Sequence, residues 1–183
     1  VADAPWEDRV AGFYSTCRVG DEIRAYYRSA ILEWDNEDNT ACFALAVSTD
    51  GGKSFFRPNL GLIAFRGSTA NNLLQVGGIP QTPPGFLDRN PHCPPEERFK
   101  GLTARWQELY AQVSADGLHW RSLLDGPVKM TGAFDTVNTA FWDSVADCYR
   151  SYTRYFENMT AETTAEEVLG PRPTVVRAIQ TST

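Results

Sequence analysis

The sequence predicts an all-β fold of the β-propeller type, and three observations support this prediction. A segment that reads as a strand, a tight turn and an aromatic residue occurs over 44–55 and again over 109–120. Its aspartates, Asp50 and Asp116, lie 66 positions apart. Residues 176–183 resemble the strand half of a third copy. Strand-rich repeats of this length are typical of propeller blades.

The first unit is expected over residues 6–76. Alternating polar and apolar residues predict strands over 12–18 and 22–29, joined by a turn at 19–21. An acidic loop over 33–40 separates them from a strand over 41–48, which runs into the Asp50 turn. These elements predict one blade of three or four antiparallel strands.

A loop of about residues 77–97 is expected to link this blade to the second. Proline lacks the amide donor that a strand ladder needs, so a proline-rich stretch argues against a strand. Its prolines are Pro80, Pro83, Pro84, Pro91, Pro94 and Pro95. The second blade is expected over 98–131, with strands at 98–106, 108–114 and 120–123.

The third blade is expected over 132–183 and is truncated. Strands are predicted at 138–142, 149–156 and 173–181, with a short helix inserted over 160–170. Thr164 and Glu167 fit a capping box and Gly170 fits a helix stop. The chain thus holds about two and a half blades, and a propeller needs about four to eight to close. The missing C-terminal blades of the same protein are therefore an expected partner.

Composition restricts the partners further. The net charge is −6 and no basic stripe is present, which argues against nucleic acid as a partner. No apolar stretch is long enough to cross a bilayer, so a membrane is not an expected partner either. The four cysteines have no C-x-x-C spacing, so no metal and no cofactor are expected. Buried free thiols are the favoured state, with the three possible disulfide pairings left open.

The two repeated turns are expected to be structural. Ser48-x-Asp50-x-Gly52-x-Ser54-Phe55 fits the Asp-box pattern, and residues 114–120 form a version one residue shorter. The carboxylate in such a turn caps backbone amides, glycine supplies a positive φ, and the aromatic residue fills space between strands. The conspicuous aspartates of these hairpins are therefore not the expected catalytic groups.

Acidic residues that precede each unit are the catalytic candidates. Inner strands of a propeller line its central channel, so side chains at the strand entries converge. Glu7 precedes the first unit, Asp88 and Glu97 precede the second, and Asp135 precedes the third. Glycosidic cleavage needs one carboxyl to protonate the leaving oxygen and another to activate water or attack the sugar. A local structural role remains the alternative for each acid.

Substrate-binding candidates lie near these acids. Arginine can bind sugar hydroxyls or hold a carboxylate, and tryptophan offers a face on which a sugar ring stacks. The alternatives are a solvated surface arginine and a core tryptophan. The candidates are Trp6, Arg28, Arg89, Asn90, Asn138 and Trp142.

Several segments together resemble a known group of proteins. They are Pro5-Trp6-Glu7, Tyr26-Tyr27-Arg28, Ser48–Gly51, Pro58–Gly61, Asn71-Asn72, Asp88–Pro91, Glu97–Lys100, Ser114–Trp120, Gly132–Asp135, Asn138 and Phe141–Asp143. The chain is similar over nearly its whole length to bacterial proteins described as similar to glycoside hydrolase families 32 and 43. This resemblance implies a five-bladed β-propeller of which the chain is roughly the first half.

The resemblance also implies an activity. It favours hydrolysis of a carbohydrate glycosidic bond by paired carboxylates. Because half a propeller would expose strand edges, the 183-residue chain is expected to be inactive by itself. Two alternatives stay open: a carbohydrate-binding propeller without catalysis, and a sialidase-like propeller with an arginine cluster and a tyrosine nucleophile. The bacterial periplasm or secretion is favoured over the cytoplasm.

Overall fold

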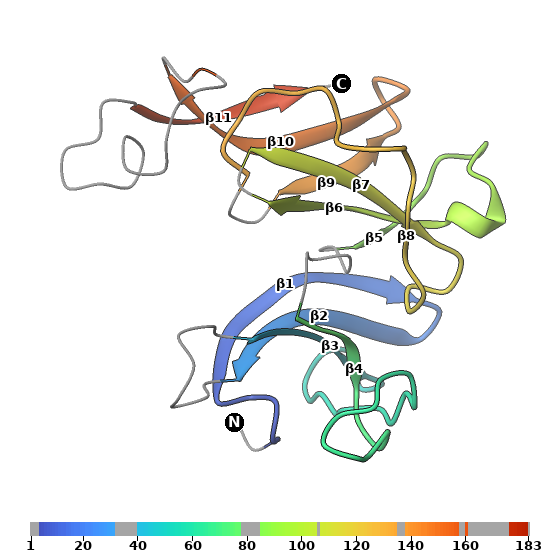
Figure 1. Cartoon of the computed structure of the whole chain (residues 1–183). Helices are drawn as coiled ribbons and strands as arrows, with labels where there is room; N and C mark the ends of the chain where they lie inside the picture. Colours follow the sequence, from blue (N-terminus) through green and yellow to red (C-terminus); the bar gives the residue numbers. More distant parts are fainter. Residues whose placement is uncertain are drawn as a thin grey trace.

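Three antiparallel sheets follow one another along the chain and stack face to face (Figure 1). The computed structural model describes residues 4–31, 40–77, 85–105, 107–134, 138–157, 160 and 176–182. Each sheet is a meander in which strands adjacent in sequence pair with each other. The prediction of an all-β protein is confirmed.

The first sheet has the order β1-β2-β3-β4, with β1 Arg9–Val19, β2 Glu22–Ile31, β3 Thr40–Ser48 and β4 Leu73–Val76. A single bridge between Val47 and Phe56 continues the pairing beyond the Asp50 turn. The chain then leaves the sheet before it returns as β4, a strand that the sequence did not indicate.

The second sheet has the order β5-β6-β7-β8, with β5 Phe86–Leu87, β6 Phe99–Arg105, β7 Glu108–Ser114 and β8 Arg121–Ser122. Both β5 and a short 3₁₀ turn over Pro95–Glu97 lie inside the segment expected to be only a loop. The two residues of β5 lie between Pro84 and Pro91, where both amides are available for pairing with β6.

The third sheet has the order β11-β10-β9, with β9 Thr139–Asp143, β10 Cys148–Glu157 and β11 Val176–Ser182. The expected helix over 160–170 falls, apart from Thr160, outside the described residues. No helix in the described part of the chain is long and apolar enough to traverse a membrane.

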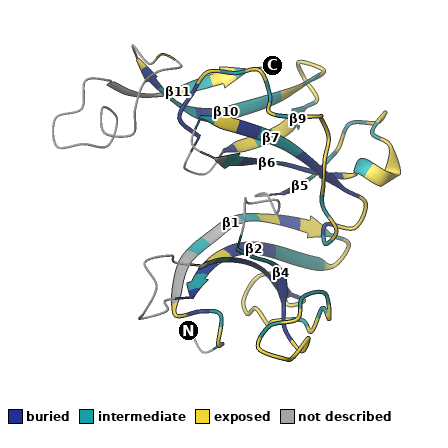
Figure 2. Ribbon diagram, viewed as in Figure 1, coloured by how far each residue is buried: buried dark blue, intermediate teal, exposed yellow. Residues whose placement is uncertain are grey.

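The first sheet packs on both of its faces (Figure 2). Successive side chains of a strand point to opposite faces, so Tyr26 and Tyr27 of β2 face opposite ways. Tyr27 belongs to an apolar cluster with Ala44, Leu73 and the half-buried Trp6. Tyr26 belongs to a second cluster that includes Phe99 of the second sheet. The second cluster therefore joins the first two sheets.

The four cysteines are thiols in this structure. Cys17 and Cys42 are buried in the first sheet, while Cys93 and Cys148 are partly exposed. Burial, together with the charge of Asp8, raises the pKa of Cys42 to about 11.

Candidate functional site

A polar cluster lies where the second and third sheets meet. We name it the seam cluster, and its members are Asp88, Asn90, Glu97, Lys100 and Tyr149. Asp88 follows β5, Lys100 lies on β6 and Tyr149 lies on β10. Pairing of β5 with β6 brings Asp88 near Lys100, and contact between the second and third sheets adds Tyr149.

Asp88 is the centre of the seam cluster. Its carboxylate has no solvent-exposed area; it accepts a hydrogen bond from Tyr149 Oη at 2.7 Å and lies 3.4 Å from Lys100 Nζ. Its other oxygen accepts the amide of Asn90 at 2.9 Å. Burial acts to raise its pKa, but these hydrogen bonds, that of Cys93 and the charge of Lys100 outweigh it and hold the pKa below its usual range. Asp88 is thus an ionised, enclosed carboxylate.

Glu97 is held by two cations. Its Oε2 lies 3.3 Å from Lys100 Nζ and its Oε1 accepts a bond from Arg121 Nη2 at 3.1 Å. Burial acts to raise the pKa of Glu97, but Arg121 and Lys100 outweigh it and lower the pKa. The two carboxylates and two cations balance in charge, so Asp88 and Glu97 suit an anionic role better than that of a proton donor.

Tyr149 connects the carboxylate to an aromatic surface. Its ring lies 4.9 Å from that of Trp142 in an edge-on arrangement, and Asn90 Nδ2 donates to its hydroxyl at 3.1 Å. Burial and the hydrogen bond to Asp88 raise the pKa of Tyr149 to about 12. Asp88, Glu97, Asn90 and Trp142, predicted from separate segments, therefore lie together.

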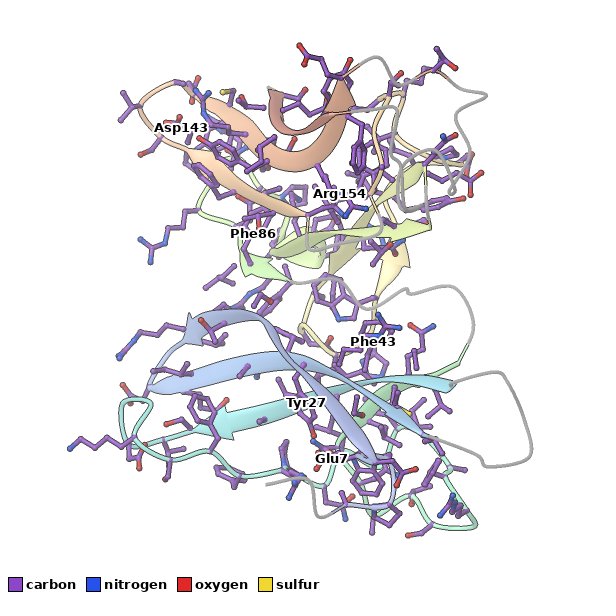
Figure 3. The ribbon with its side chains drawn as sticks, turned by 90° about the vertical axis from the view of Figure 1, so that its left-hand side faces the viewer. Glu7, Tyr27, Phe43, Phe86, Asp143 and Arg154 are labelled. Atoms are coloured by element: carbon purple, nitrogen blue, oxygen red, sulfur yellow. The ribbon has the colours of Figure 1, made fainter. Side chains whose placement is uncertain are left out.

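Glu7 lies in a different place. Arg57 binds it in a two-pronged ion pair at 3.0 and 2.6 Å, and Tyr27 Oη donates to it at 2.5 Å. Asn72 Nδ2 donates to Tyr27 Oη at 2.7 Å. Tyr27 is on the face of the first sheet that points away from the second sheet, so the first sheet lies between Glu7 and Phe86 of β5 (Figure 3). Asp88 follows β5 in the chain, on the far side from Glu7. The structure does not bring Glu7 into the seam cluster.

The remaining candidates are scattered. Trp6 packs edge-on against Phe65 at 5.9 Å, beside Glu7. Arg28 is exposed on β2 and Arg89 is exposed beside Asp88. Asn138 is buried, and its Nδ2 donates to the carbonyl of Phe134 at 2.8 Å. This bond stabilises the backbone just before β9.

Asp135 falls outside the described residues. Its placement relative to the seam cluster therefore stays a prediction.

The predicted capping by the turn aspartates is confirmed. Asp50 Oδ1 accepts the amides of Lys53 and Ser54 at 2.9 and 3.0 Å. Asp116 Oδ1 accepts the amides of Leu118 and His119 at 2.8 and 2.9 Å. Both carboxylates are occupied by their own turns.

Sequence reasoning overlooked Lys100, Tyr149 and Arg57 as site residues. Lys100 lies in the alternating pattern of a strand, where a buried cation needs a carboxylate nearby, and this was the available signal. Tyr149 and Arg57 reach their carboxylates across 61 and 50 positions, and no local pattern reports such contacts.

Among the described residues, no group of three or more histidines, cysteines or acidic residues is arranged to hold a metal ion. No protein family, no curated protein and no solved structure matches this chain.

Proposed function

We propose that this chain belongs to a β-propeller that acts on carbohydrate, with the seam cluster beside the sugar site. The convergence of Asp88, Glu97, Asn90 and Trp142 supports the proposal. Three meandering sheets of similar build, stacked in sequence order, are what successive blades would form.

The reaction that we propose is hydrolysis of a glycosidic bond. Such a reaction needs an ionised carboxylate and a carboxylic acid with a raised pKa. Asp88 has a lowered pKa, so it fits a carboxylate that orients the site and stabilises positive charge on the sugar. We assign the acid to Asp135, which precedes the third sheet in the sequence.

Carbohydrate binding without catalysis is the second candidate. One observation favours it: the carboxylate of Asp88 has no exposed area, so a substrate does not reach it in this arrangement. Sugar contact would then fall to Trp142 and to the amide of Asn90.

A sialidase-like reaction is less well supported. It needs a tyrosine that ionises readily, and the pKa of Tyr149 is raised to about 12 by burial and by Asp88. The cation at Asp88 is a single lysine, Lys100, in place of an arginine cluster.

The test separates binding from turnover. The whole protein is exposed to a panel of oligosaccharides; binding is measured by calorimetry and cleavage by release of reducing ends. We expect Asp135→Asn to abolish cleavage and retain binding, and Trp142→Ala to weaken binding at least tenfold. Phe141→Ala is the matched control, since strand alternation places Phe141 on the opposite face of β9. Binding without cleavage would establish the second candidate, and absence of both would refute the proposal.

A further inference from the structure

The turn over residues 114–120, which belongs to the second sheet, packs on the first sheet. The ring of Trp120 lies 6.1 Å from that of Tyr26. Tyr26 Oη donates to the carbonyl of Gly117 at 3.0 Å, and Arg24 Nη1 donates to the carbonyl of Asp116 at 2.6 Å. The face of one sheet therefore serves as a seat for the aromatic residue of the next sheet's turn.

The seat has a defined position in the first sheet. Ser48, which begins the turn of this sheet, pairs with Ile23. One residue beyond Ile23 is Arg24, paired with Cys17 on β1, and two residues further is Tyr26, paired with Leu45 on β3. Directly paired residues share a face, so Arg24, Cys17, Tyr26 and Leu45 form one surface, the seat.

The second sheet repeats this register. Ser114, which begins its turn, pairs with Phe99. The residue after Phe99 is Lys100, paired with Phe86, and two residues further is Leu102, paired with Ala111. These positions correspond one by one to the seat residues of the first sheet.

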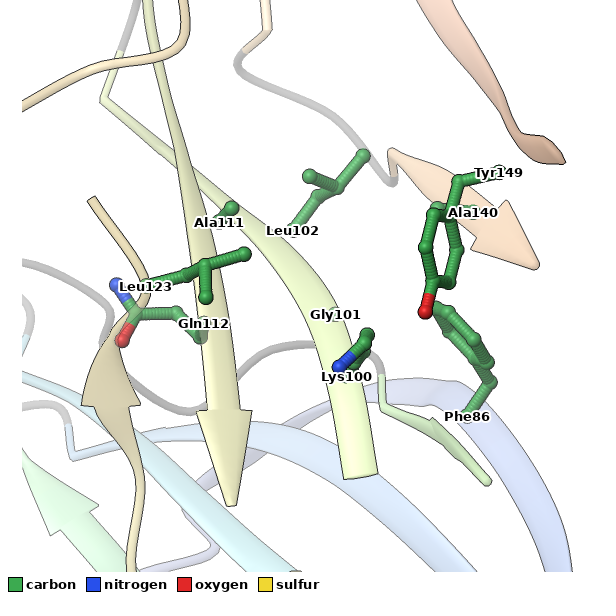
Figure 4. A pocket seen from close by; sticks show the side chains of 9 residues that line it. All are labelled: Phe86, Lys100, Gly101, Leu102, Ala111, Gln112, Leu123, Ala140 and Tyr149. Carbon is green, nitrogen blue, oxygen red and sulfur yellow. The ribbon is translucent and has the colours of Figure 1, made fainter. Parts of the chain in front are cut away.

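All four corresponding residues line a pocket between the second and third sheets (Figure 4). The third sheet contributes Ala140 and Tyr149 to the same pocket. Its volume is about 210 Å³, below the range of about 300–1,000 Å³ typical of ligand pockets. Leu102 and Ala111 are smaller than Tyr26 and Leu45, which offsets the larger Phe86 at the position of Cys17, and the pocket leaves room for a ring.

The third sheet has a serine at the corresponding end of its strand β11. Ser182 pairs with Ser151, which is the register position that Ser48 and Ser114 hold in their own sheets. The sequence carries a serine at this position in all three sheets.

The first turn provides a contrast. Its aromatic residue, Phe55, is 39% exposed, whereas Trp120 joins the apolar cluster on the first sheet. The buried position of the aromatic residue in the second turn thus coincides with the face of the first sheet.

We propose that the pocket between the second and third sheets is a seat that accepts the aromatic side chain of an Asp-box turn, as the corresponding face of the first sheet accepts Trp120. In this arrangement the aromatic ring packs on Phe86, Leu102 and Ala111. Lys100, at the position of Arg24, keeps its contacts with Asp88 and Glu97.

The test supplies such a turn in cis. An extension after Thr183 that copies Asp116–Ser122 makes a Ser-x-Asp turn starting at Ser182. We expect Tm to rise by about 4–8 °C, the scale on which one buried large side chain shifts a chain of this size. The same extension with alanine in place of the residue copied from Trp120 is the matched control, and it should raise Tm by less than about 2 °C.

A blocking variant locates the contact. Ala111→Phe fills the pocket from β7, so the extension should add no increase in Tm on that background. Ala140→Leu narrows the pocket from the third sheet and replaces Ala111→Phe if that variant does not fold. An unchanged Tm for the extended chain, or an equal increase for the alanine extension or for the blocked chain, would overturn the proposal.

Discussion

The buried carboxylate of Asp88 allows a quantitative test of the seam cluster. Asp88→Asn keeps the shape of the side chain but removes the charge that Tyr149, Asn90 and Lys100 satisfy. Removing one partner of a buried ion pair costs about 3–5 kcal/mol. Lys100 keeps Glu97 at 3.3 Å, which reduces the cost, so we expect a loss of about 2–3 kcal/mol in the free energy of unfolding.

Urea denaturation measures this loss, and for a chain of this length it corresponds to a fall in Tm of about 4–12 °C. Asp125→Asn, in an exposed turn, is the matched control and should change the free energy of unfolding by less than about 0.5 kcal/mol. If Asp88→Asn lowered the free energy of unfolding no more than this control, the enclosed ion pair would not contribute to stability.

The same variant has a defined pH dependence. Because the folded pKa of Asp88 is lowered, its charge stabilises the fold above the unfolded pKa of about 3.9. This contribution is lost as pH falls through the lower folded pKa. The difference between wild type and Asp88→Asn should therefore be constant above about pH 5 and shrink below about pH 4. A difference that persisted unchanged into acid would contradict the lowered pKa.

Three further predictions concern other parts of the fold. Glu7→Gln leaves Arg57 without its buried carboxylate, and because Arg57 is 35% exposed the free energy of unfolding should fall by about 2–3 kcal/mol in urea denaturation; a loss below about 1 kcal/mol would argue against the pair. Gly117→Ala should destabilise by about 2–4 kcal/mol, since a Cβ there would lie 2.5 Å from the Tyr26 hydroxyl. Gly51→Ala is its control, with nearly the same φ of +77° and open space, and an equal loss for both would exclude the steric reason. Cys42, buried and with its pKa raised to about 11, should react with a thiol reagent only after unfolding; modification of the native chain would contradict its burial.

The turns were predictable because their bonds are local. Ser48 and Asp50 are two positions apart, and their geometry follows from the residue types and the spacing. The strand β7 was predicted with its observed bounds, because alternation of polar and apolar residues marks it clearly. Features that depend on a few neighbouring residues could therefore be read from the sequence.

The sequence could not predict that Glu7 and Asp88 lie in different places, Glu7 on the outer face of the first sheet and Asp88 in the seam cluster. Glu7 and Asp88 each precede a unit, so position along the chain treats them alike. The difference arises because Glu7 binds Tyr27, on one face of β2, whereas the second sheet packs on the face of Tyr26. Which face of a strand receives a neighbour depends on contacts distant in the sequence, and the spacing of residues does not encode it.

The bonds from Arg24 and Tyr26 to the neighbouring turn have a dynamic consequence. Separating the first two sheets requires both to break and the indole of Trp120 to enter water, so this boundary opens only when most of the molecule opens. The boundary between the second and third sheets is also bonded, by Tyr149 to Asp88 and Asn90, but it encloses a pocket. Fewer residues are buried in β10 than in β2. Amide protons of β10 should therefore exchange with deuterium sooner than those of β2, and local opening should begin at the C-terminal sheet.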